Sequence, residues 1–114
     1  MDEHMIKNMD ASEALSLAGL VEIRPGEVAS KTLVQNESVS MTLFAFDKGE
    51  EISTHESKGD ALVIALEGEG EIVIGGEPFQ LRAGESILMP ANKPHSVSAV
   101  EPFKMFLVVV FPKS

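Results

Sequence analysis

Two histidines follow similar local sequences, and their side chains are the first candidates for chemistry. His55 lies six residues after Gly49, in a stretch that continues to Gly68. His95 ends a second stretch that starts at Gly84 and contains a short apolar run and a proline-marked turn. An imidazole can bind a transition metal, exchange a proton near neutral pH or anchor a polar ligand. If neighbouring strands bring the two turns together, the histidines form the floor of a pocket.

A metal ion held by the pair is one interpretation. Tightly bound transition metals have three or four protein ligands, commonly three histidines or two histidines with a carboxylate. Strand alternation turns the carboxylates of Glu56 and Asp60 away from His55. His4 reaches the pair only if the N-terminal tail folds over the two histidines. The prediction is one divalent ion (Fe, Mn, Ni or Zn) at His55 and His95, with an unidentified third ligand.

A pocket without metal is the alternative interpretation. Each histidine is then a neutral residue bonded to a hydroxyl or a backbone carbonyl, and Ser57 is a candidate partner for His55. Met89 and Phe44 are candidates for an apolar lining, because small barrels often hold one small ligand. This interpretation predicts that His55, Ser57, Met89 and His95 line a pocket for a small polar or anionic molecule.

Two charged residues near these stretches have simpler explanations. Asp60 follows a glycine at a strand entrance, where an aspartate often bonds to nearby backbone amides and sets the turn. Lys104 stands alone in the apolar run 103–111. We expect it to be exposed at a sheet edge or paired with a carboxylate, because a buried lone ammonium is costly.

The segments that position these residues are mostly strands. From Val21 onward apolar residues recur with a period of about two, and glycine, proline or asparagine turns separate the segments. We expect a tail and short helix over residues 1–20, capped by Asp10 and Glu13 and ending near Gly19, followed by one β-domain over residues 21–114. Strands are predicted at 21–24, 28–35, 39–46, 51–54, 61–67, 69–74, 79–81, 86–89, 95–99 and 103–111. Many short strands indicate an all-β sandwich or barrel.

Residues 61–66 and 105–111 are apolar without alternation. A strand of a small antiparallel barrel normally turns one face to water, so the outer face of these strands needs a cover. A second copy of the chain is the predicted cover, giving a homodimer with Leu62, Ile64 and part of the C-terminal strand near its interface. The alternative is that the N-terminal segment folds over this face.

Composition limits the classes of partner. The chain has 114 residues, 44% of them hydrophobic, and a net charge of −9. Such an acidic chain repels nucleic acid and anionic lipid, so neither is an expected partner. It has no cysteine, which excludes disulfides and thiolate metal sites and fits a cytoplasmic protein.

The two histidine stretches resemble the paired motifs of the cupin superfamily. The family's first motif reads G-x5-H-x-H-x(3 or 4)-E-x6-G, and its second reads G-x5-P-x-G-x2-H-x3-N. Together the two stretches bracket about 50 residues of the chain. The matching positions are Gly49, His55, Gly68, Gly84, Pro90 and His95.

The chain also departs from these motifs. Ser57 and Ala61 stand where the family has its second histidine and its metal-binding glutamate, and Asn92 stands at a family glycine. Of the four usual metal ligands, His55 and His95 remain. The resemblance implies a double-stranded β-helix, or jelly-roll barrel, and many dimeric relatives.

Two functions from different classes follow from these observations. The first is a small-molecule-binding cupin with its pocket at the barrel mouth. The second is a metal-dependent cupin enzyme, such as a dioxygenase, isomerase or decarboxylase, acting on a small polar substrate. Cupin-fold sugar epimerases pair a histidine base with a tyrosine acid, and the chain has no tyrosine, which argues against that branch.

Overall fold

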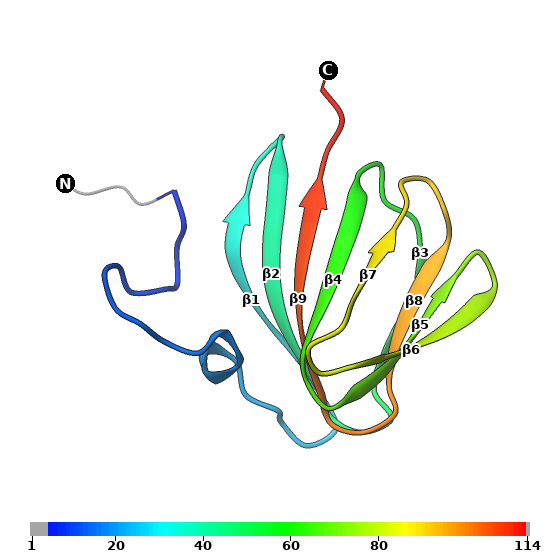
Figure 1. Ribbon diagram of the computed structural model, residues 1–114, viewed down its shortest axis with the longest axis horizontal. Coiled ribbons are helices and arrows are strands. Elements are labelled where there is room, and N and C mark those ends of the chain that lie inside the picture. The colour runs from blue at the N-terminus through cyan, green and yellow to red at the C-terminus, as the bar shows by residue number, and fades with distance from the viewer. Residues whose placement is uncertain (1–4, 114) are drawn as a thin grey trace.

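The computed structural model describes residues 5–113, which form two antiparallel β-sheets that face each other (Figure 1). In this part of the chain, one sheet has five strands in the order β1-β2-β9-β4-β7, and the other has four in the order β3-β8-β5-β6. The all-β prediction is therefore confirmed. The strands are β1 (Val28–Gln35), β2 (Val39–Phe46), β3 (Glu51–His55), β4 (Asp60–Glu67), β5 (Glu69–Ile74), β6 (Glu77–Arg82), β7 (Ser86–Met89), β8 (His95–Ala99) and β9 (Phe103–Val110).

Turn residues determine where the strands end. Of the strands in residues 5–113, five have the predicted bounds and four differ by one or two residues at an end. Gly75 and Gly76, with φ of 57° and 85°, form the hairpin turn between β5 and β6. A two-residue hairpin turn of this kind requires positive φ at its central residues, which glycine adopts without a steric penalty.

The N-terminal segment differs from the prediction. Within residues 5–113 the only helical element is the single 3-10 turn η1 (Leu17–Leu20). A short N-terminal helix is therefore present and ends near Gly19 as expected, but its predicted start at Asp10 is wrong. So short a helix is not stable in isolation, and it forms here where its leucines reach the sheet. The strand predicted at 21–24 is also wrong, because these residues pair with no strand of the described chain. No helix among residues 5–113 is long and apolar enough to cross a bilayer.

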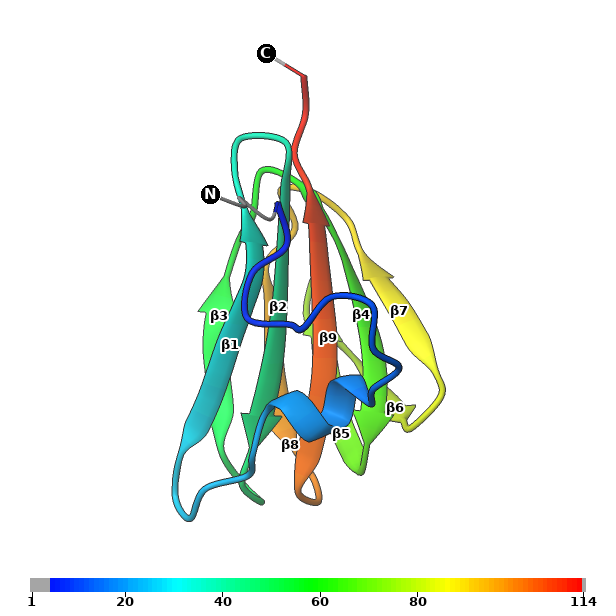
Figure 2. The ribbon, with the colours of Figure 1, turned by 90° about the vertical axis from the view of Figure 1, so that its left-hand side faces the viewer.

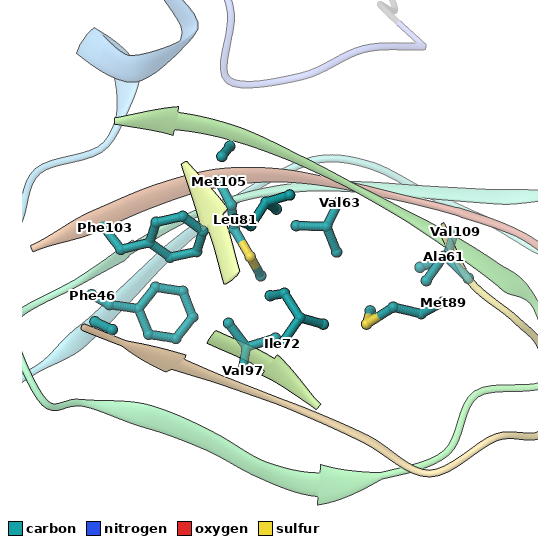
Figure 3. Packing of buried hydrophobic residues seen from close by; sticks show 12 residues of the cluster. Phe46, Ala61, Val63, Ile72, Leu81, Met89, Val97, Phe103, Met105 and Val109 are labelled. Atoms are coloured by element: carbon teal, nitrogen blue, oxygen red, sulfur yellow. The ribbon is translucent and has the colours of Figure 1, made fainter. Parts of the chain in front are cut away.

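The main core fills the space between the two sheets and is unevenly packed (Figure 3). At one end Phe46 and Phe103 lie fully buried with ring centroids 5.8 Å apart. At the other end the core side chains are Ala61, Met89 and Val109 (Figure 3). Aromatic rings fill the first end, whereas the second end has smaller or more flexible side chains.

A second apolar cluster lies on the outer face of the five-stranded sheet. Leu17 and Leu20 of η1 pack there against buried residues that include Leu43 and Phe106, and Figure 2 shows the N-terminal segment crossing this face. The alternative cover predicted for this face is therefore correct for part of it. Lys104 is fixed under the segment, since its Nζ donates to the Ala18 carbonyl at 2.8 Å.

Lys104 is thus not at an exposed sheet edge. Its side chain is 13% exposed, and its Nζ lies 3.8 Å from the carboxylate of Glu67. The second half of the prediction, a carboxylate partner, is the correct one. The Lys104 ammonium has the Ala18 carbonyl as a neutral acceptor and the Glu67 carboxylate as a charged one. These two partners offset the cost of its partial burial.

Gly68 offers a test of this fold. At φ 77° an added Cβ would collide with the backbone carbonyl of Pro102. We expect Gly68→Ala to lower the free energy of unfolding by more than about 2 kcal/mol, since a strained φ and a backbone clash add. The control is Gly76→Ala, where φ is 85° and an added Cβ would meet no other atom within 4 Å. If urea unfolding showed that both variants lose the same free energy of unfolding, the close approach of Gly68 to the Pro102 backbone would be contradicted.

Candidate functional site

The two histidines of the sequence motifs meet at the open end of the barrel. β3 ends at His55, β8 begins at His95, and the two residues are register partners. Their Nε2 atoms lie 3.1 Å apart. The ring centroids are 4.3 Å apart and the ring planes cross at 74°. Adjacent strands thus bring together two imidazoles that are 40 residues apart in the chain.

Backbone carbonyls fix the tautomer of both rings. Nδ1 of His55 lies 2.9 Å from the Ser53 carbonyl, and Nδ1 of His95 lies 3.1 Å from the Lys93 carbonyl. A carbonyl oxygen only accepts hydrogen bonds, so each Nδ1 carries a hydrogen and donates it. In a neutral ring the lone pair is then on Nε2. The two Nε2 atoms therefore present converging lone pairs, which require a shared proton, a donor group or a cation.

Ser57 is not the partner of His55, so that prediction is wrong. The Ser57 hydroxyl accepts a hydrogen bond from the Gly59 amide at 3.1 Å. Both residues belong to the turn between β3 and β4. Ser57 therefore shapes the turn that follows His55 rather than setting the orientation of the ring.

The two histidines differ in their environments. His95 is 2% exposed, whereas His55 is exposed. Burial lowers the pKa of His95, and the neighbouring His55 lowers it further. The Lys93 carbonyl and the charge of Glu56 raise this pKa, but by less. The balance favours the neutral form of His95, with its Nε2 lone pair available.

A cavity of about 510 Å³ opens beside the pair. The four residues predicted for the ligand pocket line it, as does the candidate Phe44. Most of the other wall residues are apolar, and no sequence motif marks them. The residues that line the cavity are Phe44, Ile52, His55, Glu56, Ser57, Lys58, Ala61, Met89, His95, Val97, Leu107, Val109 and Phe111.

Glu56 lines the cavity although alternation predicted that it turns away. The pairing of β3 with β8 shifts between Ile52 and His55, and β3 ends at His55. Strict alternation therefore does not extend to Glu56. No sequence signal marks this shift, because it arises from the pairing of two strands.

Two hydrogen bonds lock together the turns that carry the histidines. Asp60 accepts the Ala91 amide at 2.8 Å, and the Asn92 amide donates to the Ser57 carbonyl at 2.8 Å. Asp60 bonds to a backbone amide as predicted, across the site rather than within its own turn. Asn92 adopts φ 65°, a left-handed conformation that asparagine tolerates better than most residues. It therefore replaces the glycine of the family motif at little cost.

The histidine pair fits two positions of a metal site but no more. With metal–nitrogen bonds of about 2.0–2.1 Å, two neighbouring ligands lie about 2.9 Å apart in octahedral and about 3.4 Å apart in tetrahedral geometry. The observed Nε2 separation of 3.1 Å falls between these values. Among residues 5–113, however, no group of three or more His, Cys, Asp or Glu side chains is placed to hold an ion. His4, the other candidate, lies outside the described residues.

Comparison with known proteins identifies the family. Residues 42–111 match the family model of the cupin domain. This chain belongs to the cupins. The match spans both histidine turns and the strands β3 to β9.

Several solved structures share the cupin fold of this chain. A conserved protein of unknown function from Streptococcus pyogenes is 42% identical, with a TM-score of 0.96 over 98% of both chains. A cupin superfamily protein from Desulfitobacterium hafniense is 33% identical, with a TM-score of 0.90 over 94% of this chain and 98% of that one. Both alignments cover nearly the whole of this chain.

One curated relative is named as an enzyme. It is a dimethylsulfoniopropionate lyase from Ruegeria pomeroyi, 26% identical over 93 residues. The alignment covers 77% of this chain and 61% of the lyase. The matched part of this cupin therefore corresponds to about three fifths of that protein.

The environment of His95 predicts a pH dependence of stability. Its folded-state pKa is lowered from 6.5, so the unfolded chain binds more protons at slightly acidic pH. The contribution of His95 is then fully present above about pH 6.5 and is lost as the pH falls through the folded-state pKa. Urea unfolding between pH 5 and pH 8 should show this loss, and His95→Gln should reduce it. An unchanged pH slope in the variant would contradict the lowered pKa.

Proposed function

We propose that this cupin is a small-molecule-binding protein whose ligand occupies the cavity beside His55 and His95. The observation that supports this most directly is the pair of Nε2 atoms 3.1 Å apart at the edge of the cavity. Ligand pockets are typically apolar with a few convergent polar groups, and the cavity is in their usual size range. A cytoplasmic location, expected from the composition, belongs to the same proposal.

The second candidate is a metal-dependent enzyme. The Nε2 separation favours it, because 3.1 Å suits two ligands of one ion. The similarity to a lyase supports an enzyme class without indicating a substrate. In this case substrate, solvent or a further residue would complete the coordination, and the ion would act as a Lewis acid.

Metal and ligand analysis of the purified chain separates these candidates. We expect protein prepared without a histidine tag to contain less than about 0.1 equivalent of metal, and native mass spectrometry to detect a bound small molecule. The control is the His55→Ala/His95→Ala double variant, which should lose that molecule. About one equivalent of Fe, Mn, Ni or Zn that disappears in the variant would support the enzyme candidate instead.

We also propose that the cupin forms a homodimer through the uncovered part of the outer sheet face. Leu62 and Leu88 are register partners on β4 and β7, and they are 37% and 54% exposed. Val110 on β9 is 58% exposed. Ile64, also predicted near the interface, belongs instead to the cluster beneath the N-terminal segment. The exposed side chains form an apolar surface that a second copy would cover symmetrically.

The dimer proposal predicts the effect of a charge on this surface. We expect Leu88→Asp to convert a dimer into a monomer in light scattering after size exclusion, because an unpaired carboxylate in an apolar interface is costly. Val100→Asp is the matched control, since Val100 is 39% exposed and follows β8, a strand of the other sheet. A native chain that is monomeric at about 100 μM, or a Leu88→Asp chain that remains dimeric, would contradict the proposal.

A further inference from the structure

We infer that the ligand is a small apolar molecule whose head group is a hydrogen-bond donor, a hydroxyl or an amine, and that this group binds the two Nε2 atoms. The inference rests on the proposed function and specifies the chemistry of its ligand. It departs from the polar or anionic molecule expected from the sequence, because the structure adds two facts. These facts are the direction of the lone pairs and the composition of the walls.

The direction of the lone pairs follows from the backbone. The Ser53 and Lys93 carbonyls occupy both Nδ1 hydrogens, so neither neutral ring has a further N–H to offer a ligand. The cavity therefore meets two acceptors at this edge. An anionic carboxylate brings only acceptors of its own, and three acceptors without a hydrogen between them repel one another. A hydroxyl can donate to one Nε2, and an amine can donate to both.

The walls favour an apolar body on the ligand. Phe44, Leu107, Val109 and Phe111 come from the five-stranded sheet or its end, and Ile52 comes from the opposite sheet. Burial of hydrocarbon against such walls contributes roughly 25 cal/mol per Å² of apolar surface. A strongly polar body would lose its hydration without gaining partners. The ligand is thus polar at one end only.

Charges at the mouth do not select an anion. Glu56 and Lys58 both line the cavity and are both exposed. Their opposite charges largely cancel and are screened by solvent. The net charge of the chain is −9, which disfavours a carboxylate at long range. The two Nε2 atoms of His55 and His95 are therefore the groups that discriminate among ligand head groups.

Four probes with one aromatic body test the inference. They are toluene, benzyl alcohol, benzylamine and benzoate, titrated into the full chain at about pH 8 and followed by NMR. We expect the alcohol to bind about threefold to tenfold more tightly than toluene, the gain from one net hydrogen bond. The amine should bind at least as tightly as the alcohol, because it can donate to both Nε2 atoms. Benzoate should bind no more tightly than toluene.

The variant His55→Phe keeps a ring at this position and removes its acceptor. Because His55 is exposed, the substitution should leave the fold intact, which an unchanged midpoint of urea unfolding would verify. We expect the advantage of benzylamine over toluene to fall by about threefold or more.

Three results would overturn the inference, and they are distinguishable. Preferential binding of benzoate, or an undiminished benzylamine advantage in His55→Phe, would refute the donor head while leaving ligand binding in place. One equivalent of metal lost on mutation of the histidines would show that the lone pairs bind an ion. Failure of all four probes to bind would remove the proposed function together with this inference.

Discussion

Two backbone carbonyls determine what the histidine pair can do. By accepting the Nδ1 hydrogens of His55 and His95, the carbonyls of Ser53 and Lys93 direct both Nε2 lone pairs to one point. In most settings an imidazole can exchange tautomers and offer either a donor or an acceptor. Here the backbone removes that choice, so the pair acts as a double acceptor. The acceptor role is therefore built into the strand ends, and side-chain substitutions elsewhere in the pocket would not easily change it.

The same local order explains why the site lies at one end of the barrel. The Asp60 carboxylate accepts the Ala91 amide, and the Ser57 carbonyl accepts the Asn92 amide, which joins the start of β4 and the β3–β4 turn to the β7–β8 turn. Those bonds tie together the two turns that flank the imidazoles. At the opposite end Phe46 and Phe103 are fully buried against each other. One end of the barrel therefore serves stability, and the other is free to serve binding.

The N-terminal segment covers part of the apolar outer face of the five-stranded sheet and leaves the rest exposed. The strands β4 and β9 are apolar on both faces, and η1 with its flanking residues covers only part of the outer face. The anchoring of Ala18 by Lys104 fixes where that cover lies. Leu62, Leu88 and Val110 remain accessible beyond it. Coverage by the chain itself and coverage by a second copy are thus complementary explanations of one apolar surface.

The strand pattern was readable from the sequence because turn residues and two-residue alternation act locally. Glycines such as Gly75 and Gly76 mark turns through their own φ preferences, so β5 and β6 could be placed without knowing their partners. The N-terminal segment was not predictable in this way. Residues 10–13 satisfy a capping pattern, yet no helix forms there, because tertiary contacts with the sheet stabilise only Leu17–Leu20.

The sequence alone determined that the chain is an all-β cupin barrel with histidines at two strand ends, because spacing and residue type carry that information. Tertiary structure alone decided the direction of the Nε2 lone pairs, the position of Glu56 and the apolar walls of the cavity. The register shift beside His55 arises from the pairing of β3 with β8. The two carbonyl acceptors reach the rings because the backbone bends next to each histidine. Such features depend on three-dimensional contacts rather than on the order of residues along the chain.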